Sequence, residues 1–162
     1  MKATGIVRRI DDLGRVVVPK EIRRTLRIRE GDPLEIYTDR EGGIVLRKYS
    51  PIGELSQFSK QYAEALAQNT GYIVSITDRD QHIAVAGAGK KDLAKKAISR
   101  QMDTLMNQRE SLLAVKGERK FIPITEDGGE NYTAQVIYPI IAEGDAIGTV
   151  ILTTKYGWVR WR

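Results

Sequence analysis

The first fifty residues consist of short apolar and β-branched segments separated by polar turns. Residues 4–10 and 16–18 have the composition of strands, and Asp11-Asp12-Leu13-Gly14 between them is typical of a turn. Pro19 lacks an N–H and has a helical φ, so it predicts the start of a helix that runs to about Leu26. A helix of roughly two turns is not stable alone, so it must pack against these strands.

A hairpin is predicted after this helix. Glu30-Gly31-Asp32-Pro33 breaks the chain, and residues 34–38 and 44–48 are then predicted to be strands joined by the turn 39–43. The pattern therefore predicts a unit of four strands and one short helix. Fifty residues with so few large apolar side chains make a marginal core. Without cysteine or a plausible metal site to brace it, we expect oligomerisation to complete this core.

An amphipathic helix is predicted from Pro51 to about Asn69. Ser50 is a good N-cap, proline is favoured at the first helical position, and Gly71 is a stop signal. Its apolar stripe recurs at intervals of three and four: Ile52, Leu55, Phe58, Tyr62 and Ala65. Two interpretations remain open, because this stripe can pack on the domain's own sheet or pair with a partner's helix, and one helix can do both.

The remaining chain predicts an α/β domain. The strands expected from its apolar segments are 72–77, 82–86, 111–115, 121–124, 132–141 and 146–154. Between them, a stripe of Leu, Ile and Met predicts a helix over residues 92–109.

Charge and composition indicate a polyanion as the partner and exclude chemistry that depends on cysteine. The chain has 162 residues and a net charge of +5. Residues 1–50 hold 12 basic and 8 acidic side chains, and the remaining residues hold 14 and 13, so the first third carries most of the attraction for a polyanion. The absence of cysteine excludes disulfides, thiolate metal sites and cysteine nucleophiles. With no long apolar run and no signal-peptide pattern, we expect a soluble bacterial cytoplasmic protein that does not bind membranes.

Three motifs carry a resemblance to a known family. They are MKATGIVRRIDDLGR at the start, then Val18-Pro19-Lys20-Glu21-Ile22-Arg23-Arg24, and Glu30-Gly31-Asp32. Residues 1–50 resemble the AbrB-type swapped-hairpin DNA-binding domain, which implies a β-rich barrel formed as an intertwined dimer. The whole chain resembles two-domain sporulation transcription factors of endospore-forming bacteria. This second resemblance implies activation and repression of forespore genes, with a homotetramer formed through the second domain.

The DNA-binding residues implied by the resemblance are Arg8, Arg15, Arg23 and Arg24, with Arg9 and Lys20 as secondary candidates. Guanidinium groups bind phosphates, which sets affinity and position on double-stranded DNA. They also bind guanine edges in a bidentate way, which adds sequence preference.

The second domain, residues 51–162 with 51–70 as a connecting helix, resembles a GAF domain with a sensing or oligomerisation role. A GAF domain of this group follows its last strand with another helix, and Lys155 to Arg162 is too short for it, so the final helix is missing from the expected fold. Either the tryptophans Trp158 and Trp161 dock on the exposed surface, or the natural end is missing or altered.

No pattern in the sequence predicts a catalytic, metal or cofactor site. His82 is the only histidine and has no second metal ligand at useful spacing. Asp78, Asp80 and the acidic residues 126, 127 and 130 fall in predicted turns, where such residues are common. Gly87-Ala88-Gly89-Lys90-Lys91 lacks the phosphate-loop pattern. We therefore expect a protein that is not an enzyme, and the sequence does not identify a small-molecule ligand for the GAF-like domain.

Two other classes of function are open at this stage. The same N-terminal fold occurs in antitoxins, which bind DNA as dimers and neutralise a toxin with a disordered tail, although the C-terminal part here is apolar and patterned. A small-molecule sensor without specific DNA binding is the other alternative.

Overall fold

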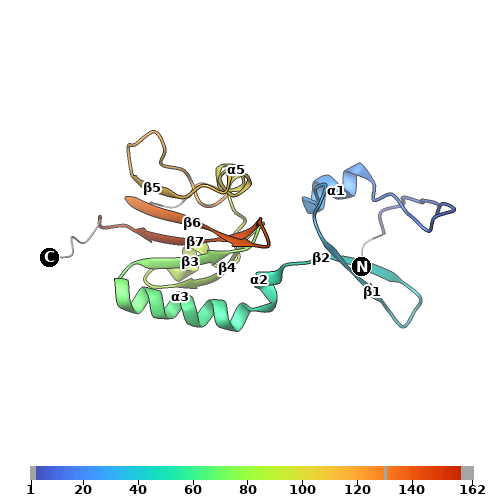
Figure 1. Ribbon diagram of the computed structural model, residues 1–162, viewed down its shortest axis with the longest axis horizontal. Helices are drawn as coiled ribbons and strands as arrows, with labels where there is room; N and C mark the ends of the chain where they lie inside the picture. Colours follow the sequence, from blue (N-terminus) through green and yellow to red (C-terminus); the bar gives the residue numbers. More distant parts are fainter. Residues whose placement is uncertain (1–2, 130, 158–162) are drawn as a thin grey trace. The chain divides into compact units, whose positions relative to one another are not determined.

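The structure is a computed structural model that describes residues 3–129 and 131–157. The chain divides into two compact units, Met1–Tyr49 and Ser50–Arg162 (Figure 1). No helix of the described residues combines the length and the apolarity needed to cross a membrane. The expected docking of Trp158 and Trp161 concerns residues outside the described part of the chain, as does the acidic candidate at position 130.

In its described residues, 3–49, the first unit contains one helix and one hairpin. Helix α1 spans Lys20–Leu26, and strands β1 (Leu34–Thr38) and β2 (Ile44–Lys48) pair antiparallel. The turn between the strands is closed by the Asp39 carboxylate, which accepts hydrogen bonds from the amides of Glu41 and Gly43. These elements confirm the predicted helix and hairpin.

The other two predicted strands do not form within a single chain. Residues 4–10 and 16–18 belong to no strand ladder in the described residues, and the expectation of four strands in one chain is wrong. A strand exists only where its backbone groups pair with a neighbouring strand. Around the turn, one backbone bond of 2.9 Å joins the Asp11 amide to the Arg15 carbonyl, and no ladder continues from it within the described residues.

The second unit is built on an antiparallel sheet of five strands in the order β4-β3-β7-β6-β5. The strands are β3 (Ile73–Thr77), β4 (His82–Ala86), β5 (Leu112–Val115), β6 (Ala134–Ala142) and β7 (Asp145–Thr154). The predicted strand 121–124 is absent from the sheet. That segment ends instead in an isolated bridge between Ile98 and Thr125, which ties two loops together.

Both long helices predicted for this unit are interrupted. The first divides into α2 (Pro51–Glu54) and α3 (Ser56–Thr70), and the second into α4 (Lys90–Leu93) and α5 (Arg100–Gln108). Helix α5 starts at residue 100 because the Ser99 hydroxyl caps it by accepting a hydrogen bond from the Met102 amide.

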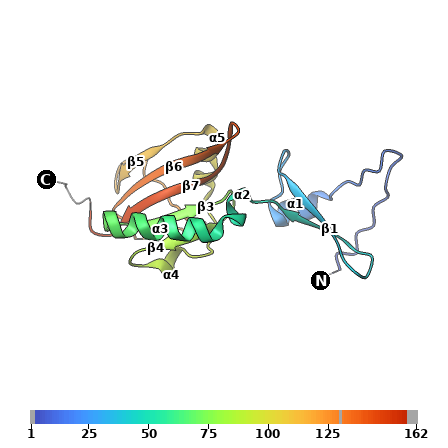
Figure 2. The same ribbon diagram turned by 60° about the horizontal axis from the view of Figure 1, so that its bottom comes forward.

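Side chains on the two faces of the sheet form separate cores. Met102 and Met106 of α5 pack with Ile137 and Ile151 on one face. On the other face Ala63 of α3 belongs to a cluster that includes Ile52, Val74, Ile76, Ala84 and Ala86. Successive strand residues point to opposite faces of the sheet. Helix α3 packs on one face and α5 on the other (Figure 2).

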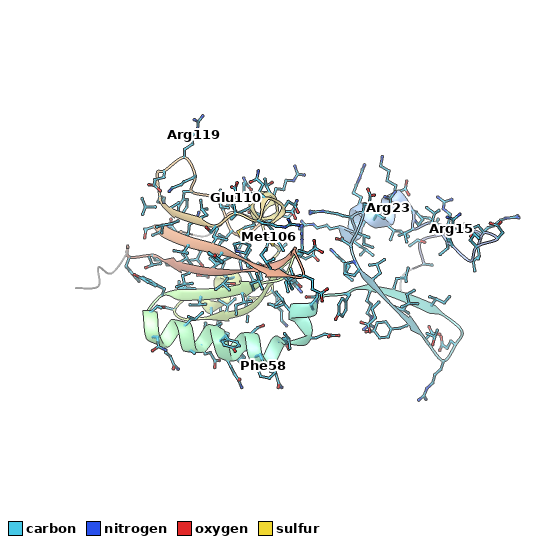
Figure 3. All side chains as sticks on the ribbon, viewed as in Figure 1. Arg15, Arg23, Phe58, Met106, Glu110 and Arg119 are labelled. Atoms are coloured by element: carbon cyan, nitrogen blue, oxygen red, sulfur yellow. The ribbon has the colours of Figure 1, made fainter. Side chains whose placement is uncertain are left out.

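Helix α3 faces the sheet with its small side chains. Ser59 and Ala63 are buried, whereas Phe58 is 59% exposed and Tyr62 66% exposed. Figure 3 labels Phe58 on this helix. The helix therefore packs on its own sheet through residues outside the predicted stripe, and most of the stripe stays exposed, with Ile52 of α2 as its buried member.

Candidate nucleic-acid interface

The turn before the valine segment 16–18 is closed by one carboxylate, that of Asp11. Oδ1 of Asp11 accepts hydrogen bonds from the amides of Leu13 at 3.0 Å and Arg15 at 2.8 Å. The Gly14 amide donates to the Asp11 carbonyl at 3.1 Å. Gly14 has a φ of 75°, a conformation that glycine adopts without a steric penalty. The predicted turn is thus a closed loop that presents Arg15 at its end.

The same carboxylate also binds the arginine side chain. Oδ2 of Asp11 accepts a hydrogen bond of 2.7 Å from Nε of Arg15, whose side chain remains 70% exposed. The hydrogen bonds from the Arg15 amide and then from its side chain hold the pKa of the Asp11 carboxyl below its ordinary value. Asp11 is therefore charged at neutral pH. It holds the backbone amide and Nε of Arg15, while the rest of this side chain extends into solvent.

Helix α1 carries the next two candidates. Arg23 and Arg24 are both exposed, and Nε of Arg23 donates to the Val18 carbonyl at 3.2 Å, which directs this side chain back along the preceding segment. The helix ends at Arg27 in a left-handed conformation, and the Ile28 amide donates to the Arg23 carbonyl at 2.8 Å. Figure 3 labels Arg15 and Arg23 on the first unit.

The other candidates are also accessible. Arg8 and Arg9 lie exposed in the extended segment before the turn, and Lys20 is the exposed first residue of α1. The structure thus groups Lys20, Arg23 and Arg24 on one short helix. Arg15 and the pair at positions 8 and 9 lie on separate segments of the same unit.

Other basic side chains of this unit have structural contacts. Nζ of Lys48 donates to the Arg27 carbonyl at 3.0 Å, which joins the hairpin to the end of α1. The guanidinium of Arg47 lies 5.3 Å from the centre of the Tyr37 ring.

The residue of this turn that the sequence pattern does not single out is Asp11, whose carboxylate binds both the turn amides and the Arg15 side chain. An acidic residue four positions before an arginine, with a glycine between them, was the available signal. Its meaning depends on the closed turn, because a strand would not bring these two side chains together.

In the second unit, His82 is part of the core. It is 1% exposed, its Nδ1 lies 2.6 Å from the Ser75 hydroxyl, and its Nε2 lies 3.0 Å from the Ile124 carbonyl. Since a carbonyl can only accept, Nε2 donates to Ile124, and in the neutral ring Nδ1 then accepts from Ser75. Both ring nitrogens thus bind protein groups, and His82 connects the loop at Ile124 to Ser75 of β3 through these two hydrogen bonds.

The acidic candidates also have structural contacts. Asp78 accepts hydrogen bonds from the amides of Asp80 and Gln81 in the turn after β3. Asp127 pairs with Lys96 at 2.8 Å, and this hydrogen bond holds the pKa of the Asp127 carboxyl below its usual value. Within residues 3–129 and 131–157, no group of three or more His, Asp or Glu side chains is arranged to hold a metal ion.

Comparisons with known proteins cover both units. Residues 54–160 match the family model "Stage V sporulation protein T C-terminal, transcription factor". Residues 7–54 match the model "Antidote-toxin recognition MazE, bacterial antitoxin".

Individual relatives agree with these matches. Stage V sporulation protein T of Bacillus subtilis (strain 168) is 54% identical over 96% of this chain and 86% of its own length. Transition state regulatory protein AbrB of the same organism is 41% identical over 69% of this chain and 97% of its own. The solution structure of the N-domain of the transcription factor abrB is 65% identical over 32% of this chain and 96% of its own, with a TM-score of 0.29.

Proposed function

The chain belongs to the stage V sporulation protein T family, and we propose that it regulates sporulation genes by binding double-stranded DNA through a dimer of its first unit. The relatives named as a transcription factor and as a transition state regulator support this function. Activation and repression are both part of the proposal, as is action in the cytoplasm of the forespore. The same family membership supports a role without catalysis.

The observation that carries the proposal is the exposed apolar surface of the first unit. Among its described residues Pro19 is the only one that is buried. The large apolar side chains left exposed are Ile6, Val7, Ile10, Leu13, Val16, Val17, Leu26, Ile36, Tyr37, Ile44, Leu46 and Tyr49. Burial of one such aliphatic side chain contributes about 1.5–3 kcal/mol, so this set strongly favours association.

A second copy supplies what the single chain lacks. The unpaired segments 4–10 and 16–18 would find strand partners in the other copy, and the apolar side chains would form one shared core. We propose that the product is an intertwined barrel of swapped hairpins. The two-fold symmetry of such a dimer doubles the arginines at positions 8, 15, 23 and 24.

The proposed surface binds DNA through charge and geometry together. Phosphate contacts by these arginines position the dimer on the duplex, and bidentate contacts to guanine provide sequence preference. Arg15 and Arg23 suit this task because Nε of each is already held by a protein oxygen, at Asp11 and Val18 respectively. Preorganised guanidinium groups lose less conformational freedom on binding.

The decisive experiment measures DNA binding and dimerisation of the full chain in parallel. We expect Arg15→Ala to lose retention of a DNA duplex in a gel-shift assay, while analytical ultracentrifugation shows unchanged association. Arg119→Ala is the matched control, because Arg119 is an exposed arginine of the second unit (Figure 3). Retention by Arg15→Ala equal to that of the control would refute the assignment of this arginine.

We also propose that the second unit is a GAF-like module that joins two dimers into a homotetramer. Its exposed apolar surface supports this assembly, because Phe58 and Tyr62 of α3 are exposed, as is Leu55 just before this helix. On the sheet, Leu113 of β5 and Tyr138 of β6 are exposed as well. Large exposed apolar areas of this kind are typical of protein interfaces. Sensing of a small molecule by this module is a further part of the proposal, and its test is a change in assembly size when a ligand is added.

The antitoxin alternative has one supporting observation, the match of residues 7–54 to an antitoxin family model. Against it, the second unit forms a five-stranded sheet with two cores rather than a disordered acidic tail. Transcriptional regulation is therefore the function that the observations support best.

A further inference from the structure

We propose that Asp11 is a positioning residue for DNA recognition, which holds Arg15 so that the far edge of its guanidinium faces the duplex. This inference rests on the proposed function, because it requires Arg15 to contact DNA. It goes beyond that function by assigning a role in specificity to an acidic side chain on a surface that binds a polyanion.

The geometry of the carboxylate supports this role. One oxygen, Oδ1, accepts from the backbone amides of Leu13 and Arg15 and so fixes the turn. The other, Oδ2, accepts from Nε of Arg15 at 2.7 Å. The backbone amide and the side chain of Arg15 are thus both bound to the Asp11 carboxylate.

The bond to Nε determines which edge of the guanidinium remains available. Arginine has five N–H donors in a planar fork. With Nε occupied, the outer edge formed by Nη1 and Nη2 is the one directed away from Asp11. That edge has the paired donors needed for bidentate recognition of guanine or phosphate. Asp11 therefore selects one binding edge among those that a free arginine would offer.

Charge repulsion alone predicts that Asp11 weakens DNA binding, whereas a positioning role predicts that Asp11 strengthens binding to a specific site. An acidic side chain beside a phosphate-binding surface repels DNA, so its removal should strengthen binding to every duplex. Loss of preorganisation should weaken binding only where Arg15 reads a specific site. The two effects differ in sign and in their dependence on DNA sequence, which makes the inference testable.

The neighbouring residue provides a matched control. Asp12 is exposed and carries the same charge, and within residues 3–129 it makes no hydrogen bond or ion pair with Arg15. Asp12→Asn therefore reproduces the change in charge without releasing the guanidinium. Asp11→Asn keeps an oxygen that can accept from the turn amides, and it removes the charged partner of Nε.

The experiment uses the full chain and fluorescence anisotropy at fixed salt concentration. The probes are a duplex selected from a random pool with the wild-type protein and a scrambled duplex of equal length and composition. We expect Asp12→Asn to tighten binding to both duplexes equally. Asp11→Asn should tighten binding to the scrambled duplex by the same factor, and the ratio of specific to scrambled affinity should fall about tenfold. Immobilising one long side chain accounts for roughly two- to tenfold, and each dimer contains two copies.

A double-mutant cycle separates positioning from a general effect on the fold. If Asp11 acts through Arg15, then Asp11→Asn should not lower the specificity ratio further in the Arg15→Ala background, measured at a salt concentration low enough for the Arg15→Ala protein to bind both duplexes. A further loss in that background would show that Asp11 supports the fold instead, and would overturn the inference. An Asp11→Asn protein with the specificity ratio of Asp12→Asn would overturn it as well.

These failures are distinguishable from failure of the proposed function. If Arg15→Ala itself retained wild-type affinity and specificity, the role of Arg15 in DNA binding would be wrong. If Arg15→Ala lost binding and Asp11→Asn kept the ratio, DNA binding by Arg15 would stand and only the positioning role would be refuted.

Discussion

Removal of Arg24 should change the salt dependence of DNA binding by a calculable amount. A dimer with exposed arginines at positions 8, 15, 23 and 24 presents eight guanidinium groups. If each neutralises one phosphate, log K falls with log[salt] at a slope of about −7. Arg24→Ala removes two contacts per dimer and should reduce the slope to about −5.

These slopes correspond to a large difference in measured affinity. With these slopes, between 0.1 M and 0.3 M salt the wild-type protein should lose about 2,200-fold in affinity and the variant about 240-fold. The assay is a fluorescence anisotropy titration of one labelled duplex at several salt concentrations. Arg119→Ala should keep the wild-type slope, because Arg119 is an exposed arginine outside the first unit.

The slope of log K against log[salt] is a stricter test of a phosphate contact by Arg24 than a single affinity is, because it counts phosphate contacts. A variant that binds more weakly but keeps a slope of about −7 would show that Arg24 supports the fold or the dimer and does not contact phosphate. Equal slopes for the wild-type protein and for both arginine variants would remove Arg24 from the interface.

Three further predictions concern the rest of the molecule. His82→Ala should lower the free energy of unfolding of the second unit by about 2–5 kcal/mol in urea denaturation, since it removes a buried ring and leaves the Ser75 hydroxyl and the Ile124 carbonyl without their bonds to it; a change below about 1 kcal/mol would contradict this. Phe58→Glu should reduce the assembly size in light scattering with little change in the melting temperature, because this side chain is largely exposed in the single chain; an unchanged size would exclude this side of α3 as an interface. The bonds from Arg15 lower the pKa of Asp11 in the folded state, so their contribution to turn stability is present above the unfolded-state pKa and is lost as pH falls through the folded-state pKa. NMR titration should therefore show the Asp11 carboxyl protonating at lower pH in the folded protein than in the urea-unfolded chain, and coincident titrations in the two states would contradict the turn geometry.

Much of the local structure follows from the sequence. The predicted strands at 34–38 and 44–48 are confirmed residue for residue, because alternating side chains and a glycine turn define a hairpin with its partner close by. The predicted helix after Pro19 is confirmed as well. These elements depend on neighbours within about fifteen residues, which is the range that a sequence pattern describes well.

The structure differs from the sequence-based prediction where contacts between residues far apart in the sequence determine the backbone conformation. The interruption at Leu55 allows Ile52 to enter the core below β7 while α3 lies over β3 and β4. The expected helix 92–109 loses its first half because the His82 amide bonds to the Lys96 carbonyl and the Lys95 amide bonds to the His82 carbonyl. Tertiary hydrogen bonds there override a helical pattern.

The candidate site was predictable as a list of arginines and not as an arrangement. Position and residue type identify Arg15 and Arg23, but the oxygens that bind their Nε atoms become visible only with the backbone in place. The identification of these residues as DNA contacts remains a prediction until it is measured.

The two units affect DNA binding by different routes under the proposed assembly. The first unit has little core as a single chain, so its folding and its dimerisation are one equilibrium that depends on protein concentration. Association through the second unit holds two or more copies of the first unit together and raises their effective concentration. A substitution on α3 such as Phe58→Glu should therefore weaken DNA binding most at low protein concentration, although it touches none of the arginines. Arg24→Ala should weaken binding equally at all protein concentrations, since it leaves association intact. The dependence of the two defects on concentration thus separates loss of assembly from loss of DNA contact.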